Sequence, residues 1–183
     1  MVSQVAQMNL FQLRKRGKMG TLVKRPEIMA FLDTTPASAY TWNIVGNGMT
    51  TGAYSYDANE TSETYIVDDN ATTTVDAYTI SIDGEMKCIF GDGVYDFING
   101  LRYNLSVGSS AETHVLLIDK YDQISTGNFR AQLFNCSVSV SSYGGDGGAT
   151  PTISFKINLN GTPKFGKATF TGSTPTFIET VSA

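Results

Sequence analysis

Apolar and polar residues alternate with a period of two along several stretches of the chain. Tyr40, Trp42 and Ile44 share one face of a predicted strand, and the same alternation runs through 78–83, 134–142 and 152–159. The stretch 114–118 is apolar on both faces, which is typical of a covered strand. Because alternation is the pattern of half-buried strands, the sequence predicts a mainly β protein.

A single helix and two turns are predicted between these strands. An apolar stripe at helical spacing predicts the helix, and it is formed by Val94, Phe97, Ile98, Leu101 and Leu105. Asp92 is placed to cap its start. Asn160–Gly161 predicts a two-residue hairpin turn that joins 152–159 to a strand near 164–171. The glycines of 144–148 predict a tight turn with positive φ.

Three segments lie outside the strand pattern: the two ends of the chain and a long connection at 47–75. We divide the chain into a basic N-terminal arm (1–25), a β domain (26–170) that includes this connection, and a C-terminal arm (171–183). The connection is polar and acidic, and its scattered apolar residues are Tyr54, Tyr56, Tyr65, Ile66 and Val67. Spaced aromatics in so long a loop favour an adhesive surface over a flexible linker. The C-terminal arm carries apolar groups without an obvious core partner, and the alternative is a frayed end.

Charge is distributed unevenly along the 183 residues. Residues 1–25 hold six basic residues and no acid, whereas the rest of the chain holds seven basic residues against 17 acids. The acidic body is expected to repel nucleic acid. The basic arm is open to three interpretations: a solvated tail, a nucleic-acid contact, or docking on an acidic neighbouring copy.

The chemistry of catalysis and of metal binding is sparse. With one histidine and two cysteines, no catalytic constellation, cofactor site or metal site is expected. No apolar run reaches the length of a membrane span. The charges near the N-terminus follow its apolar part, which is the wrong order for a secretion signal, so folding in the cytosol is expected.

The outward faces of four predicted strands consist almost wholly of short polar side chains. The only long basic residue on these faces is Lys156. The short polar residues are Thr41, Asn43, Thr79, Ser81, Asp83, Ser137, Ser139, Ser141, Thr152, Ser154 and Asn158. One interpretation is a composition rich in Ser and Thr. The other is a smooth, cation-poor surface past which something must slide without sticking.

Several short motifs, in their order and spacing, resemble those of the major tail tube proteins of bacteriophages with long, non-contractile tails. They are 63–71 (ETYIVDDNA), 75–78 (VDAY), 91–98 (GDGVYDFI), Gly108 and Ala111 before 116–119 (LLID), 143–146 (YGGD), and Asn160–Gly161 with 166–168 (GKA). The resemblance covers roughly 60–170, and the basic N-terminal stretch matches least.

The resemblance implies two packed antiparallel sheets with one flanking helix, in a structural protein of the virion tail. It implies hexameric rings stacked into a tube, with DNA passing through the lumen without specific binding, and assembly in the host cytoplasm. The implied partners are further copies, a tape measure protein, a tail terminator and a distal tail protein. The short polar residues above become the lumen, and contacts between rings fall to the apolar residues of 47–75 together with Arg14, Lys15 and Arg16.

Three other functions compete with this interpretation. A terminator or baseplate hub of the same fold forms one ring that does not repeat axially. A β-sandwich receptor-binding module uses 47–75 as its contact loop and does not polymerise. A hydrolytic enzyme on a β scaffold is disfavoured, because the chain lacks a paired-acid cleft and has one histidine.

Overall fold

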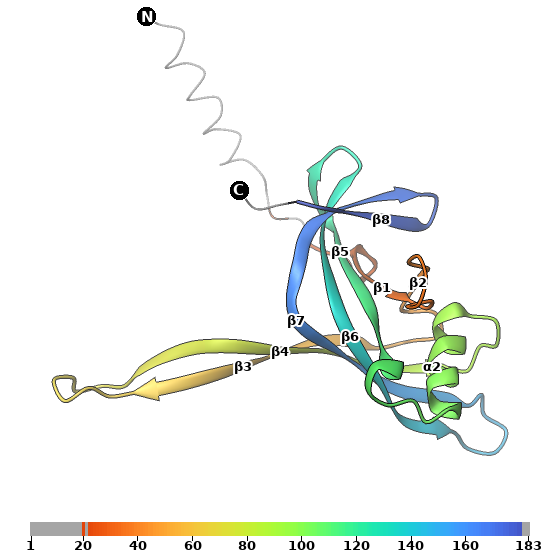
Figure 1. The fold of residues 1–183 in the computed structure, drawn as a ribbon, viewed down its shortest axis with the longest axis horizontal. Helices are drawn as coiled ribbons and strands as arrows, with labels where there is room; N and C mark the ends of the chain where they lie inside the picture. The colour runs from red at the N-terminus through yellow and green to blue at the C-terminus, as the bar shows by residue number, and fades with distance from the viewer. Residues whose placement is uncertain (1–19, 21, 181–183) are drawn as a thin grey trace, which may run out of the picture.

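The computed structural model describes residues 20 and 22–180, so Arg14, Lys15, Arg16 and Val181 lie outside the described residues. Figure 1 shows a strand-rich body from which a long two-stranded arm extends. The strands are β1 (Ile28–Asp33), β2 (Trp42–Ile44), β3 (Gly52–Glu63), β4 (Thr72–Lys87), β5 (Glu112–Ser125), β6 (Asn128–Gly144), β7 (Thr152–Thr171) and β8 (Thr174–Glu179). One α-helix, α2 (Gly93–Tyr103), and two 3₁₀ turns, η1 (Arg25–Glu27) and η2 (Gly108–Ala111), complete the described part.

Every strand pair in the sheet is antiparallel, and hydrogen bonds join the strands in the order β2-β1-β5-β6-β7-β4-β3, with β8 on β7. The first half of β7 pairs with β4 and its second half with β8, while β6 accompanies both halves. The expected mainly β class with one flanking helix is therefore confirmed. The two expected layers are two parts of one continuous, bent sheet.

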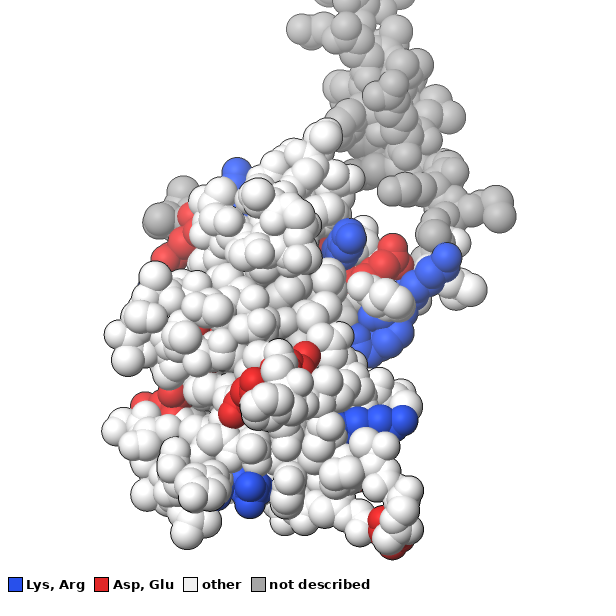
Figure 2. Space-filling model, turned by 90° about the vertical axis from the view of Figure 1, so that its right-hand side faces the viewer, with Lys and Arg blue, Asp and Glu red and all other residues white. Residues whose placement is uncertain are grey.

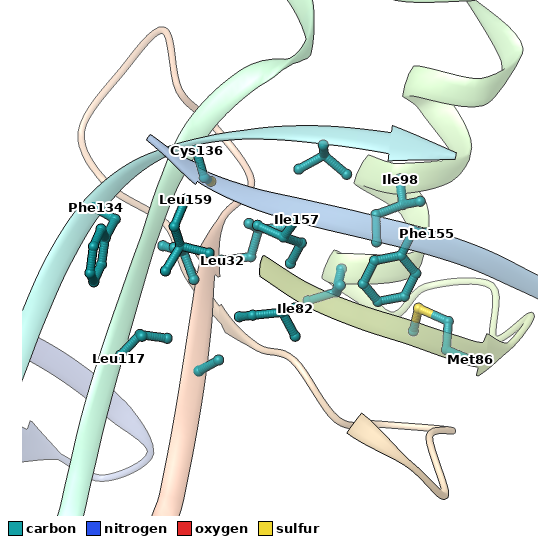
Figure 3. Packing of buried hydrophobic residues seen from close by; sticks show 14 of the residues in the cluster. Leu32, Ile82, Met86, Ile98, Leu117, Phe134, Cys136, Phe155, Ile157 and Leu159 are labelled. Atoms are coloured by element: carbon teal, nitrogen blue, oxygen red, sulfur yellow. The ribbon is translucent and has the colours of Figure 1, made fainter. Parts of the chain in front are cut away.

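The core lies on both faces of this sheet. The larger cluster packs the inner side chains of β1, β4, β5, β6 and β7 against α2, and Figure 3 shows Ile98 of α2 lying over Phe155 of β7. A smaller cluster on the opposite face joins Phe31, Leu116 and Ile118 to Phe170 and Phe177. Since Val115 and Leu117 enter the first cluster and Leu116 and Ile118 the second, β5 is a covered strand, as predicted.

The predicted helix is confirmed, with a shorter stripe than expected. Asp92 Oδ1 accepts the backbone N–H groups of Val94 (3.1 Å) and Tyr95 (3.0 Å), which is the expected cap and contributes about 1 kcal/mol. Val94 and Ile98 are buried, whereas Leu105 lies beyond the helix and is 81% exposed. Among the described residues, no helix is long and apolar enough to cross a bilayer.

Most of the expected loop 47–75 is an antiparallel ribbon, which corrects the prediction. β3 pairs with β4 along its whole length, from Gly52↔Gly84 to Glu63↔Thr72. Every residue from 56 to 79 is exposed, so this part of the ribbon buries no side chain that could produce an alternating pattern. The ribbon, here called the arm (52–84), projects from the body in Figure 1.

Asn160–Gly161 does not turn the chain, contrary to the prediction. Gly161 has a φ of 69°, so the left-handed conformation is present, but it lies inside β7. β6 pairs with β7 on both sides of this point, and the register shifts between Leu133↔Lys164 and Asn135↔Asn160. The dipeptide therefore forms a β-bulge that bends β7 between the two parts of the sheet.

The expected C-terminal arm is largely a strand. β8 pairs with the end of β7 from Gly166↔Glu179 to Thr171↔Thr174, and Phe177 packs against the smaller cluster. β1 was not predicted, because 28–33 shows no alternation of apolar and polar residues. It pairs with β5 and carries the buried residues Ala30, Phe31, Leu32 and Asp33. The strand expected near 40–46 is only the three residues of β2.

Candidate functional site: a polar sheet face with two free edges

The short polar side chains of β4, β6 and β7 lie in rows across one face of the sheet, opposite the face that α2 covers. One row is Ser81, Asn158 and Ser137, which are aligned by the register of the three strands. The next rows are Asp83–Lys156–Ser139 and Glu85–Ser154–Ser142. The structure therefore gathers the predicted residues of three separate chain segments on one surface, here called the polar face.

Hydrogen bonds between strands hold these side chains down against the sheet. Ser142 Oγ lies 2.8 Å from Ser154 Oγ, and Ser154 Oγ donates to Glu85 Oε2 at 3.3 Å. Ser141, which sits at the bulge between Val140 and Ser142, donates its hydroxyl to the Ser154 carbonyl oxygen at 3.2 Å. Hydroxyls that bond to neighbouring strands present a flat, hydrated surface.

The two long cations of the polar face are Lys156 and Lys87. Lys156 Nζ lies 3.8 Å from Asp83 Oδ1, so the one basic residue that the sequence placed here is matched by a carboxylate. Lys87 was missed, because β4 runs four residues beyond the alternating stretch, which ends at Asp83. It lies opposite Thr152 at the end of the polar face and forms no ion pair with any described residue.

Three of the predicted lumen residues do not fit the polar face. Thr41 and Asn43 belong to the β2 region at the other end of the strand order. Asn43 packs against the start of α2, where a Cβ on Gly93 would lie 2.6 Å from its amide group. Ser81 is aligned with the polar face but is 1% exposed, so its hydroxyl is covered.

The polar face ends at two sheet edges that lack a neighbouring strand in the described part of the chain. β3 pairs with β4 alone, and β6 pairs with β7 alone from Val138 to Gly144, because β5 begins opposite Ser137. Unpaired strand edges are templates for association with another chain. Seen from the end that carries α2 and the β6–β7 turn, most of the surface is uncharged (Figure 2).

A groove of about 800 Å³ runs along the free edge of β6, here called the edge groove. Its outer wall is formed by Leu101, Leu105 and Val107, and the edge strand itself supplies Val138 and Val140. Leu105 and Val107 are 81% and 80% exposed. The groove therefore combines unpaired backbone with uncovered aliphatic side chains, which is the arrangement that receives an added strand.

The predicted inter-ring residues separate into two groups along the arm. Tyr65, Ile66 and Val67 form the tip, where Ile66 and Val67 are 106% and 91% exposed. Tyr56 is exposed midway along the arm. Tyr54 instead packs against the larger core cluster under the Arg25 guanidinium, and burial raises the pKa of its phenol while Arg25 opposes that shift.

A buried acid–histidine contact lies away from the polar residues of β4 and β7. Asp33 is fully buried, its Oδ1 accepts the N–H groups of Thr35 and Thr41, and its Oδ2 lies 3.6 Å from His114 Nδ1. Burial raises the pKa of the Cys136 thiol to about 12, which makes it a poor nucleophile. In residues 20 and 22–180, no three side chains of metal-ligating type gather at one point. The hydrogen bonds that Asp33 Oδ1 accepts from Thr35 and Thr41 anchor the turn before β2.

Comparisons with known proteins add a likeness of fold. No protein-family profile matches the chain, and no curated protein sequence matches it. Among solved structures, the chain is similar to a chain in the tail of an empty GTA particle reconstructed by helical refinement with C6 symmetry. The likeness covers 79% of this chain and 98% of that chain, with a TM-score of 0.53 and 14% sequence identity. The chain thus shares its fold with a component of a sixfold-symmetric tail.

Proposed function

We propose that this chain is a structural protein of a phage-type tail, in which six copies form a ring and stacked rings form a tube for DNA. The observation that carries the proposal is the polar face bounded by two free edges. The likeness to a chain in a C6-symmetric tail supports the sixfold number. The proposed role is structural and not catalytic, and its location is the virion.

The strand directions of the polar face suit ring closure. β3, β4, β7 and β6 follow one another with antiparallel pairing, so the two outer strands run in opposite directions. Rotation about the axis of a ring keeps each strand's direction, and the β3 edge of one copy then meets the β6 edge of the next as an antiparallel pair. Such a contact, repeated around the ring, closes on itself and leaves neither edge of the polar face exposed.

The chemistry of the polar face suits the passage of DNA. Serine hydroxyls and carboxylates predominate on this face, Lys156 is matched by Asp83, and Lys87 lies at its end. The face therefore offers phosphates little of the salt-sensitive attraction that lysine and arginine supply. In the proposed ring this face lines the lumen. Further tail proteins, including a tape measure protein, a terminator and a distal tail protein, follow from the same proposal.

Negative-stain electron microscopy of the purified full-length chain, over a concentration series, tests the proposal. We expect rings at low concentration and tubes at high concentration. A variant that joins Ala58 to Tyr78 through Asn-Gly, and so removes the outer half of the arm, is expected to form rings that do not stack. Single rings from the intact chain at every concentration indicate a terminator or hub, and a monomer at every concentration contradicts the proposal.

A further inference from the structure

The tip of the arm exposes an apolar pair between acidic residues. Ile66 and Val67 sit in a turn closed by the Asp68 N–H bond to the Tyr65 carbonyl oxygen at 2.9 Å. Asp68 and Asp69 follow directly, and residues 52–86 contain eight acids and no base. An exposed aliphatic pair is unfavourable in water, so this tip is shaped for a partner that is apolar at its centre and basic at its rim.

A groove with these properties lies at the base of the arm, and we name it the base groove. It has a volume of about 470 Å³ and is lined by Met29, Ile44, Val45 and Met49, with Arg25 at its rim. The Arg25 guanidinium donates to the Ile28 and Gly52 carbonyl oxygens at 2.6 and 3.2 Å, so its position is fixed. Lys24 beside it is exposed and forms no ion pair with any described residue.

The tip cannot enter the base groove of its own chain. Strand pairing from Gly52↔Gly84 to Glu63↔Thr72 holds the arm extended. Eleven residue steps at about 3.3 Å place the tip roughly 35 Å from the start of β3, which borders the groove. A tip that enters the base groove must therefore belong to another molecule.

We propose that the arm tip of one copy seats in the base groove of a second copy. Ile66 and Val67 fill the apolar groove, while Asp68 and Asp69 face Lys24 and Arg25. Donor and acceptor surfaces differ, so the contact is heterologous and repeats from copy to copy without closing. This inference rests on the proposed function, because it names the axial contact that turns rings into a tube.

Disulfide capture tests the contact in the full-length chain. Ile66→Cys is combined with Thr51→Cys, an exposed residue of the base groove, and the matched control combines Ile66→Cys with Ser106→Cys in the edge groove. A disulfide requires Cα atoms within about 4.4–6.8 Å. Cys88 and Cys136 are present in every variant, so the single variants measure their background.

We expect oxidised tubes of the first pair to give a ladder of covalent multimers on a non-reducing gel. Single variants and the Ser106 pair are expected to give none. Tubes that yield no ladder with Thr51→Cys, or that yield one with Ser106→Cys, overturn the inference and leave the proposed function standing. An intact chain that forms no rings or tubes overturns the proposed function and this inference with it.

A second variant blocks the base groove without disturbing the fold. Gly46 lines the groove, and a Cβ placed there meets no atom within 4 Å, so Gly46→Leu is tolerated and obstructs the entrance. We expect rings to form normally and the concentration needed for tubes to rise at least tenfold. Gly147→Leu, in the β6–β7 turn with equally open space, is the control that leaves this concentration unchanged. An unchanged tube threshold for Gly46→Leu contradicts the inference.

Discussion

Leu105 occupies a backbone conformation that favours glycine, and replacing it has two opposite consequences. Its φ is 48°, and it lies just after α2. The Ser106 N–H donates to the Leu101 carbonyl oxygen (3.0 Å) and the Leu105 N–H to that of Arg102 (3.3 Å), which together form a Schellman cap. An L-residue in the left-handed region costs about 1–2 kcal/mol.

Leu105→Gly is expected to stabilise the isolated chain. Glycine removes the strain, but its freedom in the unfolded chain offsets about 0.4–1 kcal/mol of the gain. Because the Leu105 side chain is 81% exposed, little burial is lost. The net gain in the free energy of unfolding is about 0.5–1 kcal/mol, which raises Tm by roughly 1–3 °C in a chain of this size.

The same substitution is expected to weaken ring closure. In the proposed ring, Leu105 is covered by the strand that enters the edge groove, and burial of a leucine contributes about 1.5–3 kcal/mol. Its loss raises the dissociation constant of each contact by about tenfold or more. A single residue then favours assembly at the expense of monomer stability, as strained functional positions often do.

Circular dichroism melts of dilute protein and the concentration threshold for rings measure the two effects. Leu105→Ala is the matched control, because it keeps the Cβ and its strain while losing the same aliphatic group. We expect the melting temperature of Leu105→Gly to lie above that of the unchanged chain, and that of Leu105→Ala to lie at or below it. Both variants are expected to need a higher concentration to form rings. Equal melting temperatures for the two variants refute the strain, and an unchanged ring threshold refutes the placement of Leu105 in the contact.

Three further outcomes are expected. Gly161→Val forces a branched side chain to a φ of 69° in the bulge of β7 and lowers the free energy of unfolding by about 1–2 kcal/mol in a denaturant titration, whereas Gly147→Val changes it little. Because the pKa of Cys136 is raised to about 12 in the folded chain, its thiol stays unlabelled by iodoacetamide at pH 8 until denaturant is added. For the same reason, the free energy of unfolding that the protonated thiol contributes is lost as pH rises from about 9 to 12. Ser139→Arg, which adds an unmatched cation to the polar face, is expected to slow DNA release from assembled particles in a salt-dependent way, and Thr126→Arg in the exposed β5–β6 turn is not; equal release rates contradict the assignment of this face to the lumen.

The sequence predicted those features whose causes are local or that bury one face. The spacing of Val94, Ile98 and Leu101 and the Asp92 cap lie within three turns of one helix, and both are present. The rows of the polar face follow from the alternation of β4, β6 and β7, because each of these strands covers the core with its other face.

The features that were missed depend on partners distant in the sequence. Beyond Tyr56, β3 faces solvent on both sides, so pairing with β4 leaves no hydrophobic period to detect. Gly161 has the positive φ that a hairpin turn requires, but whether such a residue makes a turn or a bulge depends on the next segment. Since residues 164–168 pair with β6 and not with 152–159, the chain continues forward. The end of the helix was also misplaced. The apolar stripe continues to Leu105, although the backbone has already left the helix there.

The two free edges also differ in charge, and this difference favours the proposed ring over a dimer. The β3 edge carries Asp57, Glu60 and Glu63, whereas 138–144 of β6 is uncharged. Two β3 edges that paired across a twofold axis would place these carboxylates opposite one another, which is unfavourable in an antiparallel pair. A β3 edge beside a β6 edge brings no like charges together. Charge on one edge alone therefore disfavours the isologous pairing that would close two β3 edges into a dimer. It leaves available the heterologous pairing from which the proposed ring is built.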